Sequence, residues 1–393
     1  MIYPDYKKGS LVNLISSILS YYDMNTAYSP LENFSICDHK KLVFIVVDGL
    51  GMSFLETHGR DSLIFKNLER EITSVFPTTT SSALTALLSG LAPLQHGLTG
   101  WFMYFRELAT AGISLPFKAR FTEKVFADEG VDIQDIYNFE TFFQKWERLD
   151  NQQKFNKKGL FAITPQTTIN SAFSRFCYGT TPKKGYNNIE ESFTLIKKKI
   201  FDAPEHEMIV AYLPQFDDLA HIFGINSHEC IDFLKKLDAL FDDLFKYAQD
   251  TETLFIVTAD HGLIDTTKDT VLHISDYPDI QDCMILPLCG EPRTPFCYVR
   301  PAKLKYFIKA VEEQLGEYCD RFTMNDILER SLLGIGEINP KIYDRLGDEI
   351  LIMKDNYVMI DNVYEEKYKE MIGFHGGMSR AEMMVPLICY SCL

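Results

Sequence analysis

Carboxylate and imidazole side chains stand where three apolar segments of the sequence end. The segments are residues 42–47, 208–213 and 254–258. Each is short and rich in β-branched or other apolar residues, which is typical of a buried strand. The metal-type residues at or just past their carboxyl ends are Asp48, Asp217, Asp260 and His261. Because ligands of an open α/β sheet bind outside the carboxyl ends of its strands, these side chains are expected to meet at one rim.

Two further histidines extend this set of metal-type ligands. Asp217 and His221 are four residues apart, which puts them on the same face of a helical turn. His375 lies in a glycine-rich loop, residues 373–377, where the backbone can come close to a site. Carboxylates mixed with several imidazoles suit zinc, or alternatively manganese or iron, better than magnesium or calcium. The pattern therefore predicts a site for two divalent metal ions.

A hydroxyl-rich turn, residues 78–82, follows Val75-Phe76-Pro77 and precedes the apolar residues 83–88. This order indicates the end of a strand, a tight turn and the start of a helix. Amide groups at a helix N-terminus can donate to phosphoryl oxygens, and a metal ion lowers the pKa of a hydroxyl enough to make it a nucleophile near neutrality. The chemistry indicated is phosphoryl transfer to a hydroxyl.

Each of these pieces could also be purely structural. An Asp-Gly pair after a strand is commonly a turn, a Thr-Ser run commonly caps a helix, and His375 alone could be a loop histidine. Their order along the chain and their common place at strand ends favour the chemical interpretation.

The elements that must position these residues alternate between strands and helices. Residues 228–248 carry apolar side chains on one helical face, and residues 303–315 and 349–353 resemble a helix and a strand. Alternation predicts an α/β fold whose central sheet is mainly parallel, with helices on both faces and a cap insertion. The expected organisation is core residues 1–106, a cap insertion at 107–200, core residues 201–289, a second insertion or subdomain at 290–354, and core residues 355–393.

Net charge, the length of apolar runs and the cysteine content indicate which kinds of partner and location are expected. The 393 residues carry a formal net charge of -16, which argues against a nucleic-acid polymer as a partner, whereas two bound cations would still attract a small phosphorylated substrate. The longest purely apolar run, residues 42–47, is too short to cross a membrane. An odd number of cysteines, nine, scattered through apolar runs fits reduced thiols, and with an amphipathic N-terminal helix it predicts a cytoplasmic protein.

Five short motifs occur in a fixed order along the chain. They are VDG at 47–49, FPTTT at 76–80, a D-x3-H pair at 217–221, DHG at 260–262 and HG at 375–376. The series resembles the type I phosphodiesterase and nucleotide pyrophosphatase branch of the alkaline phosphatase superfamily. Further similarity lies in Ser89-Gly90, Pro93 and His96-Gly97, spaced as in that family's TGxxPxxHG. The resemblance covers the core at both ends of the chain and leaves the insertions unmatched.

The resemblance implies two ion sites and a covalent mechanism. Its ligands to one ion are Asp217, His221 and His375. Its ligands to the other ion are Asp48, Thr80, Asp260 and His261. It also implies that Thr80 is the nucleophile, with a neighbouring hydroxyl as the alternative, and that the reaction passes through a phosphothreonine that water hydrolyses.

The chain departs from the family pattern at two positions. Ser81 stands where the family usually has a base-stacking Phe, and Trp101 stands where an Asn donates to the phosphoryl group. Both changes weaken a specifically nucleotide-directed activity, although Trp101 could form another stacking wall or could pack the cap on the core.

Other activities on the same scaffold stay open. A phosphomonoesterase or phosphonate hydrolase would need an added cation near the phosphoryl group, for which Arg106, Lys118 and Arg120 are candidates. A sulfatase is disfavoured because the CxPxR or SxPxR signature is absent around residues 77–85. A catalytically silent protein that binds a phosphorylated ligand is the alternative outside the enzymes.

Overall fold

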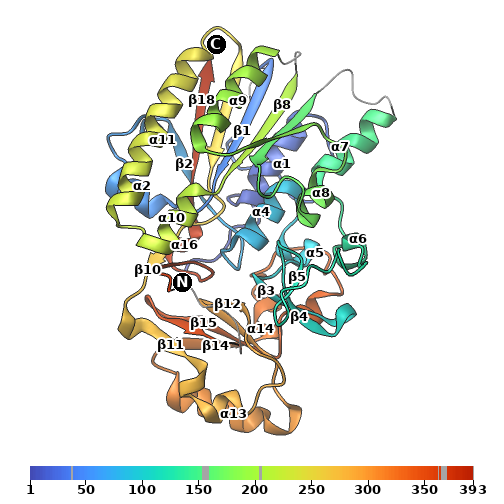
Figure 1. The fold of residues 1–393 in the computed structure, drawn as a ribbon, viewed down its shortest axis with the longest axis vertical. Helices are drawn as coiled ribbons and strands as arrows, with labels where there is room; N and C mark the ends of the chain where they lie inside the picture. Colours follow the sequence, from blue (N-terminus) through green and yellow to red (C-terminus); the bar gives the residue numbers. More distant parts are fainter. Residues whose placement is uncertain (37–38, 153–158, 203–205, 362, 364–369, 393) are drawn as a thin grey trace.

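A central seven-stranded sheet carries the upper part of the molecule in Figure 1. The computed structural model describes residues 1–36, 39–152, 159–202, 206–361, 363 and 370–392. In spatial order the strands are β2 (Leu68–Thr73), β18 (Met384–Cys392), β9 (Thr253–Thr258), β1 (Lys41–Val47), β8 (Glu207–Leu213), β6 (Leu160–Pro165) and β7 (Lys183–Tyr186). The three expected strands that precede the metal-type residues are therefore confirmed as β1, β8 and β9, next to one another at the centre.

The central sheet is mainly parallel, as the sequence predicts. β1 pairs in parallel with both β8 and β9, and β6 pairs in parallel with β8 and β7. The exception is β18, which runs antiparallel between β9 and β2. In the ladders Val47 lies opposite Leu213 and Val46 opposite Thr258, so the three central strands end at the same edge.

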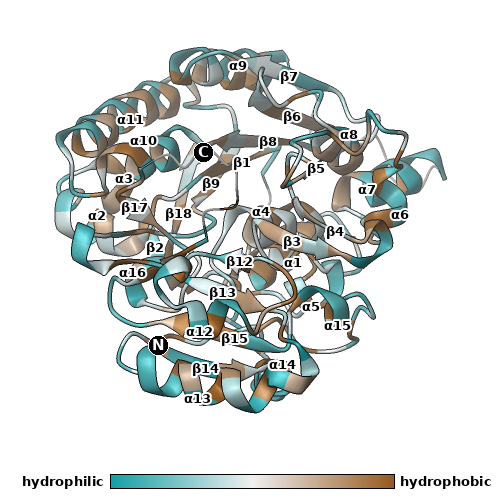
Figure 2. Cartoon of the chain, turned by 60° about the horizontal axis from the view of Figure 1, so that its bottom comes forward, coloured by the Kyte–Doolittle hydropathy of each residue, from teal (hydrophilic) through white to brown (hydrophobic). Residues whose placement is uncertain are grey.

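Helices cover both faces of this sheet, as Figure 2 shows. On one face lie α9 (Ile189–Asp202), α10 (Gln215–Phe223) and α11 (His228–Tyr247), and on the other lie α1 (Leu11–Tyr21), α4 (Thr80–Ser89) and α7 (Phe142–Asn151). In α11 the Ser227 side chain accepts a hydrogen bond from the Cys230 amide, which caps the helix. Its buried residues recur at helical spacing: Cys230, Leu234, Leu237, Phe241, Leu244 and Phe245.

A second sheet of seven strands lies below the first in Figure 1. Its spatial order is β14 (Cys319–Thr323), β15 (Glu349–Met353), β13 (Thr294–Cys297), β12 (Cys289–Glu291), β3 (Phe102–Phe105), β4 (Thr110–Ile113) and β5 (Lys118–Ala119). Every pairing in it is antiparallel. α13 (Leu304–Gln314) packs below this sheet.

Shorter elements complete the described fold. The helices are α2 (Met52–His58), α3 (Leu63–Lys66), α5 (Pro93–His96), α6 (Ile133–Ile136), α8 (Ala172–Tyr178), α12 (Pro278–Gln281), α14 (Met324–Glu329), α15 (Ile342–Arg345) and α16 (Arg380–Met383). Two strand pairs are β10 (Ile264–Asp265) with β17 (Gly373–Phe374), and β11 (Val271–His273) with β16 (Val358–Ile360). Within the described ranges, no helix combines the length and the apolar character needed to cross a membrane.

The expected insertions do not coincide with this second sheet. Strands β6 and β7 lie inside the expected cap, residues 107–200, yet they extend the central sheet. The sequence of β7, Lys-Lys-Gly-Tyr, lacks an apolar run because β7 is an edge strand with only two of its four residues buried. The second sheet instead joins residues 102–119 to residues 289–353. Residues 107–200 are thus divided between the two sheets, while the domain boundaries themselves stay a prediction.

A buried ion pair joins the second sheet to α16, the helix that directly precedes β18 of the central sheet. Arg293 lies in the turn between β12 and β13, and its Nε and Nη2 each donate to the Glu382 carboxylate of α16 at 3.0 Å. The two side chains are 1% and 0% exposed. Glu382 also accepts hydrogen bonds from the Gly377 and Ser379 amides, so the carboxylate fixes the loop that carries His375.

Removing one partner of this pair should destabilise the protein strongly. We expect Arg293→Met to lower the free energy of unfolding by about 3–5 kcal/mol, because the Glu382 charge would stay buried without its partner. Urea unfolding followed by circular dichroism measures the change. The matched control is Arg106→Met, which removes the exposed partner of Asp344 and should have a far smaller effect. Equal losses in both variants would contradict a structural role specific to the buried pair.

Candidate active site

The carboxyl edge of the central sheet gathers the acids and histidines that the sequence singled out. Asp48 directly follows β1, Asp260 and His261 follow β9, and Asp217 lies in the first turn of α10 after β8. All four side chains are buried, with residue exposures of 8% or less. The site is therefore built by chain segments that are adjacent in space because their strands are adjacent in the sheet.

Two glycines allow the segments to come this close. Gly49, after Asp48, has φ of 75°, and its amide donates to Asp260 Oδ1 at 3.1 Å. Gly262, after His261, leaves no room for a side chain, because an added Cβ would lie 2.0 Å from the Ala381 carbonyl oxygen. The glycines in the two motifs are thus required by the backbone conformation and by close packing.

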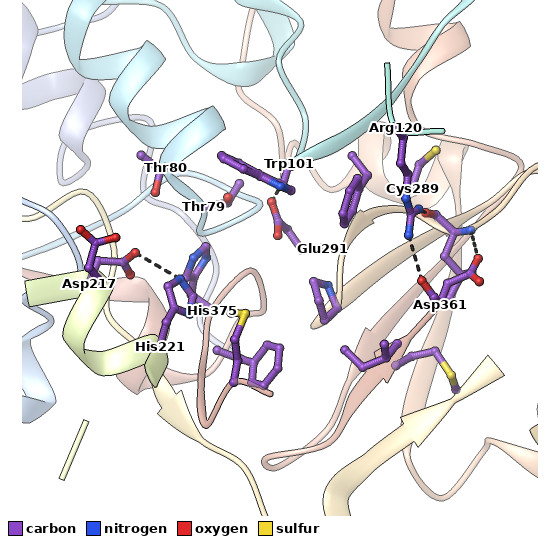
Figure 3. A pocket seen from close by; sticks show the side chains of 18 residues that line it. Thr79, Thr80, Trp101, Arg120, Asp217, His221, Cys289, Glu291, Asp361 and His375 are labelled. Atoms are coloured by element: carbon purple, nitrogen blue, oxygen red, sulfur yellow. Dashed lines mark hydrogen bonds and ion pairs between the residues drawn. The ribbon is translucent and has the colours of Figure 1, made fainter. Parts of the chain in front are cut away.

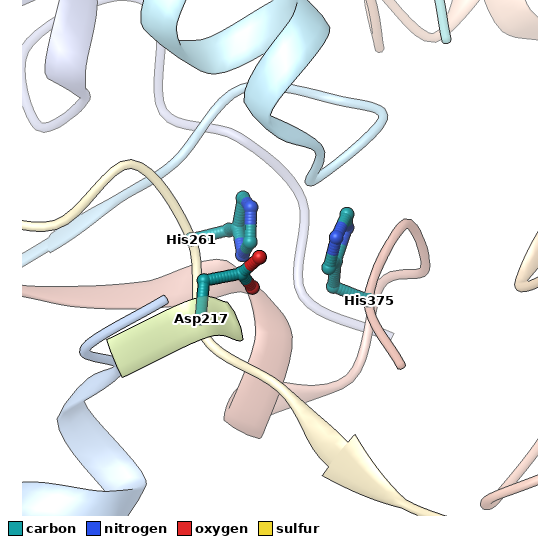
Figure 4. Close-up of side chains that lie close together, drawn as sticks. All are labelled: Asp217, His261 and His375. Carbon is teal, nitrogen blue, oxygen red and sulfur yellow. The ribbon is translucent and has the colours of Figure 1, made fainter. Parts of the chain in front are cut away.

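The ligand atoms fall into two overlapping groups. One consists of Asp217, His261 and His375, shown in Figure 4, and the other of Asp48, Asp260 and His261. Within each group the ligand atoms lie within 4.8 Å of one another. His221 lies beside the first group, with its Nε2 3.1 Å from Asp217 Oδ2. All the metal-type residues named from the sequence are therefore brought together.

The three imidazoles share one orientation. In each, Nδ1 lies within hydrogen-bond distance of a backbone carbonyl oxygen, which the ring can reach only as an Nδ1–H donor. The pairs are His221 with Gly373 at 2.8 Å, His261 with Gly262 at 3.2 Å and His375 with Thr78 at 3.0 Å. Nε2 is the other ring nitrogen, and once it has lost any proton it can bind a metal ion while Nδ1–H holds the ring in place.

The carboxylates have unused oxygens in the same space. Asp48 Oδ1, Asp217 Oδ1 and Asp260 Oδ2 are buried and have no hydrogen-bond partner in the described part of the chain. Burial, together with the charges of Asp260 and Asp217, raises the pKa of Asp48 well above its ordinary value. A buried acceptor without a donor is costly, and a cation would relieve both the missing partners and the repulsion. The donor set of carboxylate oxygens and imidazole nitrogens therefore fits divalent metal ions.

Asp217 and His221 also stabilise each other's charged forms. Burial alone would lower the pKa of His221, but the Asp217 carboxylate outweighs it and raises that pKa to about 9. Burial likewise opposes ionisation of Asp217, yet the nearby imidazoles hold the pKa of this carboxyl well below its ordinary value. Their mutual attraction fixes both side chains at the opening of the site.

The three consecutive threonines of the turn differ in what their hydroxyls contact. Thr80 is the first residue of α4, and its Oγ1 lies 3.2 Å from His261 Nε2 and 3.5 Å from Asp48 Oδ2. The Thr78 hydroxyl donates to the Gly377 carbonyl at 2.8 Å and is therefore structural. Thr79 Oγ1 is buried, and the Thr79 side chain lies beside the Glu291 carboxyl, whose ionised form it stabilises. Of the three, the Thr80 hydroxyl is the one in contact with the metal-type side chains.

A cavity of about 470 Å³ opens beside these residues, as Figure 3 shows. Thr80, His221 and His375 line one end, and Arg120 and Asp361 line the other. Between them stand Trp101 and Glu291, which also lie on the cavity wall. The cavity can therefore hold a group attached to a reacting centre at the metal-type residues.

Two residues of this site were not recognised in the sequence. Tyr212 lies on β8, and its hydroxyl donates to Asp48 Oδ2. Glu291 is the last residue of β12 and is 6% exposed, and its Oε1 accepts the Trp101 amide at 2.6 Å. Burial raises the pKa of the Glu291 carboxyl to about 7. Tyr212 could have been found from its place near the end of an expected central strand, whereas nothing local marks Glu291.

Ser81 and Trp101, the two residues that depart from the family pattern, have defined surroundings in the structure. The buried Ser81 hydroxyl lies 2.7 Å from Ser114 Oγ, and Ser114 donates to the Gly100 carbonyl, so no aromatic ring occupies this place. Trp101 lines the cavity. Its place on the cavity wall is the one that a stacking role requires, and that role stays a prediction.

The three cationic side chains that the sequence offered as candidates differ in their position relative to the cavity. Arg120 lines the cavity, where its guanidinium donates to the Leu288 and Asp361 carbonyls at 2.7 and 2.9 Å and lies 3.8 Å from the centre of the Phe102 ring. Arg106 and Lys118 are outside the cavity lining and pair with Asp344 and Glu123. Among the described lining residues Arg120 is thus the one Arg or Lys, and it is already hydrogen-bonded to the protein.

Comparison with known proteins agrees with the fold and the motifs. A family model described as type I phosphodiesterase / nucleotide pyrophosphatase matches residues 42–378. Among solved structures, murine ectonucleotide pyrophosphatase / phosphodiesterase 5 is 17% identical with a TM-score of 0.65, covering 88% of this chain and 87% of its own. The human protein of that name is 16% identical with a TM-score of 0.66, covering 89% and 87%. An inactive threonine-to-alanine variant of the murine protein, in complex with AMP, has a TM-score of 0.64 at 17% identity, covering 89% and 87%.

At these identities the similar structures establish the fold alone. A search of curated proteins gave no match.

The hydrogen bond from Tyr212 to Asp48 should matter for metal binding. We expect Tyr212→Phe to weaken the affinity for zinc by about 10–100-fold, because Asp48 would lose the donor that orients its carboxylate. Competition with a chromophoric chelator measures the affinity. Tyr186→Phe is the matched control, since the Tyr186 hydroxyl donates to the Tyr212 carbonyl and does not contact Asp48. An unchanged zinc affinity in Tyr212→Phe would refute this role.

Proposed function

Because the chain belongs to the type I phosphodiesterase / nucleotide pyrophosphatase family of hydrolases, we propose that it cleaves phosphodiester or pyrophosphate bonds of a small phosphorylated substrate through a phosphothreonine on Thr80. The proposal rests on one observation. Imidazole Nε2 nitrogens, carboxylate oxygens without hydrogen-bond partners among the described residues and the Thr80 hydroxyl lie together at the carboxyl edge of the central sheet. Such a set of donors around a hydroxyl is suited to phosphoryl transfer assisted by two metal ions.

The proposed ion sites divide the ligands as the sequence motifs of the family imply, and they differ from the two groups of nearby atoms in placing His221, and not His261, with Asp217 and His375. Asp217, His221 and His375 would hold one ion. Asp48, Thr80, Asp260 and His261 would hold the other. His261 belongs to both groups of nearby atoms, which supports two ions placed close together. We propose zinc, with manganese or iron as alternatives, because the donors mix nitrogen and oxygen.

The reaction can be described from the residues of the chain. Bound divalent ions would lower the pKa of the Thr80 hydroxyl and offset negative charge on the phosphoryl oxygens. Thr80 gives its proton to solvent, and its oxygen forms a bond to phosphorus while the bond to the departing oxygen breaks on the opposite side, where that oxygen takes up a proton from solvent. Water then attacks the same phosphorus, the bond to Thr80 breaks, and Thr80 regains a proton. The Thr80 and Ser81 amides at the start of α4 would donate to phosphoryl oxygens during both steps, since the next two amides already donate to the Thr79 carbonyl.

A nucleophilic threonine agrees with what is known of a structural relative. The murine structure in complex with AMP is described as inactive and carries a threonine-to-alanine change. For this chain we propose the corresponding dependence on Thr80, the threonine whose hydroxyl contacts His261. A nucleotide substrate is compatible with the cavity, although Ser81 provides no stacking surface.

The cavity supports a phosphodiester as the substrate in preference to a phosphomonoester. A monoester brings a further negative charge, which calls for an additional cation beside the phosphoryl group. The described lining offers Arg120, whose guanidinium is bonded to two carbonyl groups and lies at the end of the cavity remote from His221 and His375. Glu291 between them adds negative charge when it is ionised.

We also propose a cytoplasmic location. The eight cysteines in the described part of the chain are free, and seven of them are buried, as in proteins of reducing compartments. Detection of the native protein in a membrane or extracellular fraction would refute this proposal.

Replacement of the nucleophile should abolish turnover. We expect Thr80→Ala to lower the rate of bis(p-nitrophenyl) phosphate hydrolysis at least ~10³-fold, because the residual reaction would lack covalent catalysis. Thr79→Ala is the matched control, and it should retain most of the activity. Stopped assays with the aryl diester and with p-nitrophenyl phosphate measure both variants. A higher rate with the monoester would overturn the substrate class, and full activity of Thr80→Ala would overturn the nucleophile.

Removal of the metal ions should also abolish hydrolysis, because the Thr80 hydroxyl would no longer be activated. We expect dialysis against a chelator to abolish diester hydrolysis, and stoichiometric zinc, manganese or iron to restore it, because the Thr80 hydroxyl is inert at its ordinary pKa. Metal content by elemental analysis should give about two ions per chain. Metal binding without any hydrolysis in wild type would instead support a catalytically silent ligand-binding protein. Activity that survives chelation would exclude the two-metal proposal.

A further inference from the structure

Glu291 occupies a place in the cavity that the proposed chemistry does not explain. Its carboxylate stands between the end lined by His221 and His375 and the end lined by Arg120 and Asp361, as Figure 3 shows. It is delivered by β12 of the second sheet, while the metal-type residues come from the central sheet. A group that extends from the reacting phosphorus into the cavity must pass this carboxylate.

The carboxylate is held firmly in this position. Oε1 accepts the Trp101 amide at 2.6 Å, and β12 pairs with β3 through Gly290 and Phe102. Gly376 packs directly against the side chain, since an added Cβ there would lie 2.5 Å from Glu291 Cβ. These contacts hold the Glu291 carboxylate at this point of the cavity wall.

The charges that line the cavity outside the metal-type residues are mostly negative. In the described lining they are the carboxylates of Asp218, Glu291 and Asp361 and the guanidinium of Arg120. Asp218 is exposed, so solvent screens its charge, whereas Glu291 is buried. The guanidinium of Arg120 is directed to the carbonyls of Leu288 and Asp361. Outside the metal-type residues, Glu291 is therefore the buried carboxylate among the described residues that line the cavity.

The remaining walls suit an uncharged or cationic group. Trp101 and Phe102 contribute aromatic rings, and Leu288, Met359 and Ile360 contribute aliphatic surface. Aromatic faces attract cations and accept flat neutral groups, and they offer no donors to an anion other than the indole N–H.

We infer that Glu291 selects the substrate by charge, so that the cavity favours a phosphodiester whose cavity-bound ester group is neutral or positively charged and disfavours one that carries further phosphate or carboxylate. This inference rests on the proposed function for the reaction, and it adds which ester groups the site accepts. Glu291 is a specificity residue in this scheme and takes no part in bond making.

Binding of three small phosphate monoesters tests the inference without using turnover. The probes are 2-aminoethyl, 2-hydroxyethyl and 2-carboxyethyl phosphate, which differ in the charge of one terminal group. Isothermal titration calorimetry on metal-loaded protein at about pH 8.5 keeps Glu291 ionised, because burial raises its pKa to about 7, and keeps the amine protonated. We expect the amine to bind at least tenfold more tightly than the carboxylate, with the alcohol between them, as the Coulomb interaction at short range requires.

Three variants separate the effect of the Glu291 charge from the effects of its hydrogen bond and of a neighbouring carboxylate. Glu291→Gln keeps an acceptor for the Trp101 amide and should reduce the ratio of amine to carboxylate affinity about tenfold. Glu291→Asp should keep part of the selection because it keeps the charge. Asp218→Asn removes an exposed charge from the same cavity and should change the ratio by less than about twofold.

The outcomes distinguish failure of this inference from failure of the proposed function. Equal affinities for the three probes in wild type, an unchanged ratio in Glu291→Gln, or an equal effect of Asp218→Asn would each overturn the role of Glu291, even if diester hydrolysis is observed. Charge selection that disappears in Glu291→Gln, in a protein that hydrolyses no diester, would uphold this inference and refute the proposed reaction. Thermal unfolding of each variant shows that a changed affinity does not arise from misfolding.

Discussion

Repulsion among buried carboxylates is the constraint on which the arrangement of this protein depends. Asp48, Asp217 and Asp260 converge at the carboxyl edge of three adjacent strands, and each has an oxygen that no described residue satisfies. Three negative charges in so small a volume would oppose folding unless positive charge were supplied. The Nδ1 nitrogens of the histidines beside them face backbone carbonyls, and the Nε2 nitrogens of His221 and His261 face the carboxylates, between which a metal ion would bind. The arrangement of these side chains thus favours the binding of cations at the place where a phosphoryl group would react.

The part of this site that could be predicted from the sequence is the part encoded locally. Asp48 and the Asp260-His261 pair follow long apolar runs, and parallel strands with such runs place their carboxyl ends at one edge. The spacing of Asp217 and His221 is likewise a local helical property. For these residues, strand position and spacing were sufficient to predict their convergence.

What could not be predicted depends on pairings between distant segments. Glu291 reaches the cavity because β12 pairs with β3, which is far away in the sequence, and three-residue β12 has no pattern of its own. Strand β7 falls within the expected cap because an edge strand does not need a continuous apolar run. The second sheet combines two segments that each look like a separate insertion, so its existence follows from tertiary pairing alone. Substrate selection, which we infer to involve Glu291 of this sheet, is accordingly the property least visible in the sequence.

The place of β18 in the central sheet has a consequence for biosynthesis. It lies between β2 and β9, although it follows every other strand of that sheet in chain order. On the ribosome, β9 can join β1 early, but its other edge must remain without a partner until β18 emerges, and β2 can join only after that. An unpaired edge beside apolar residues is prone to associate with other chains. The emergence of β18 therefore closes the sheet and brings the neighbouring His375 loop to the other acids and histidines at its edge, so that before this point a nascent chain is expected to need protection by chaperones.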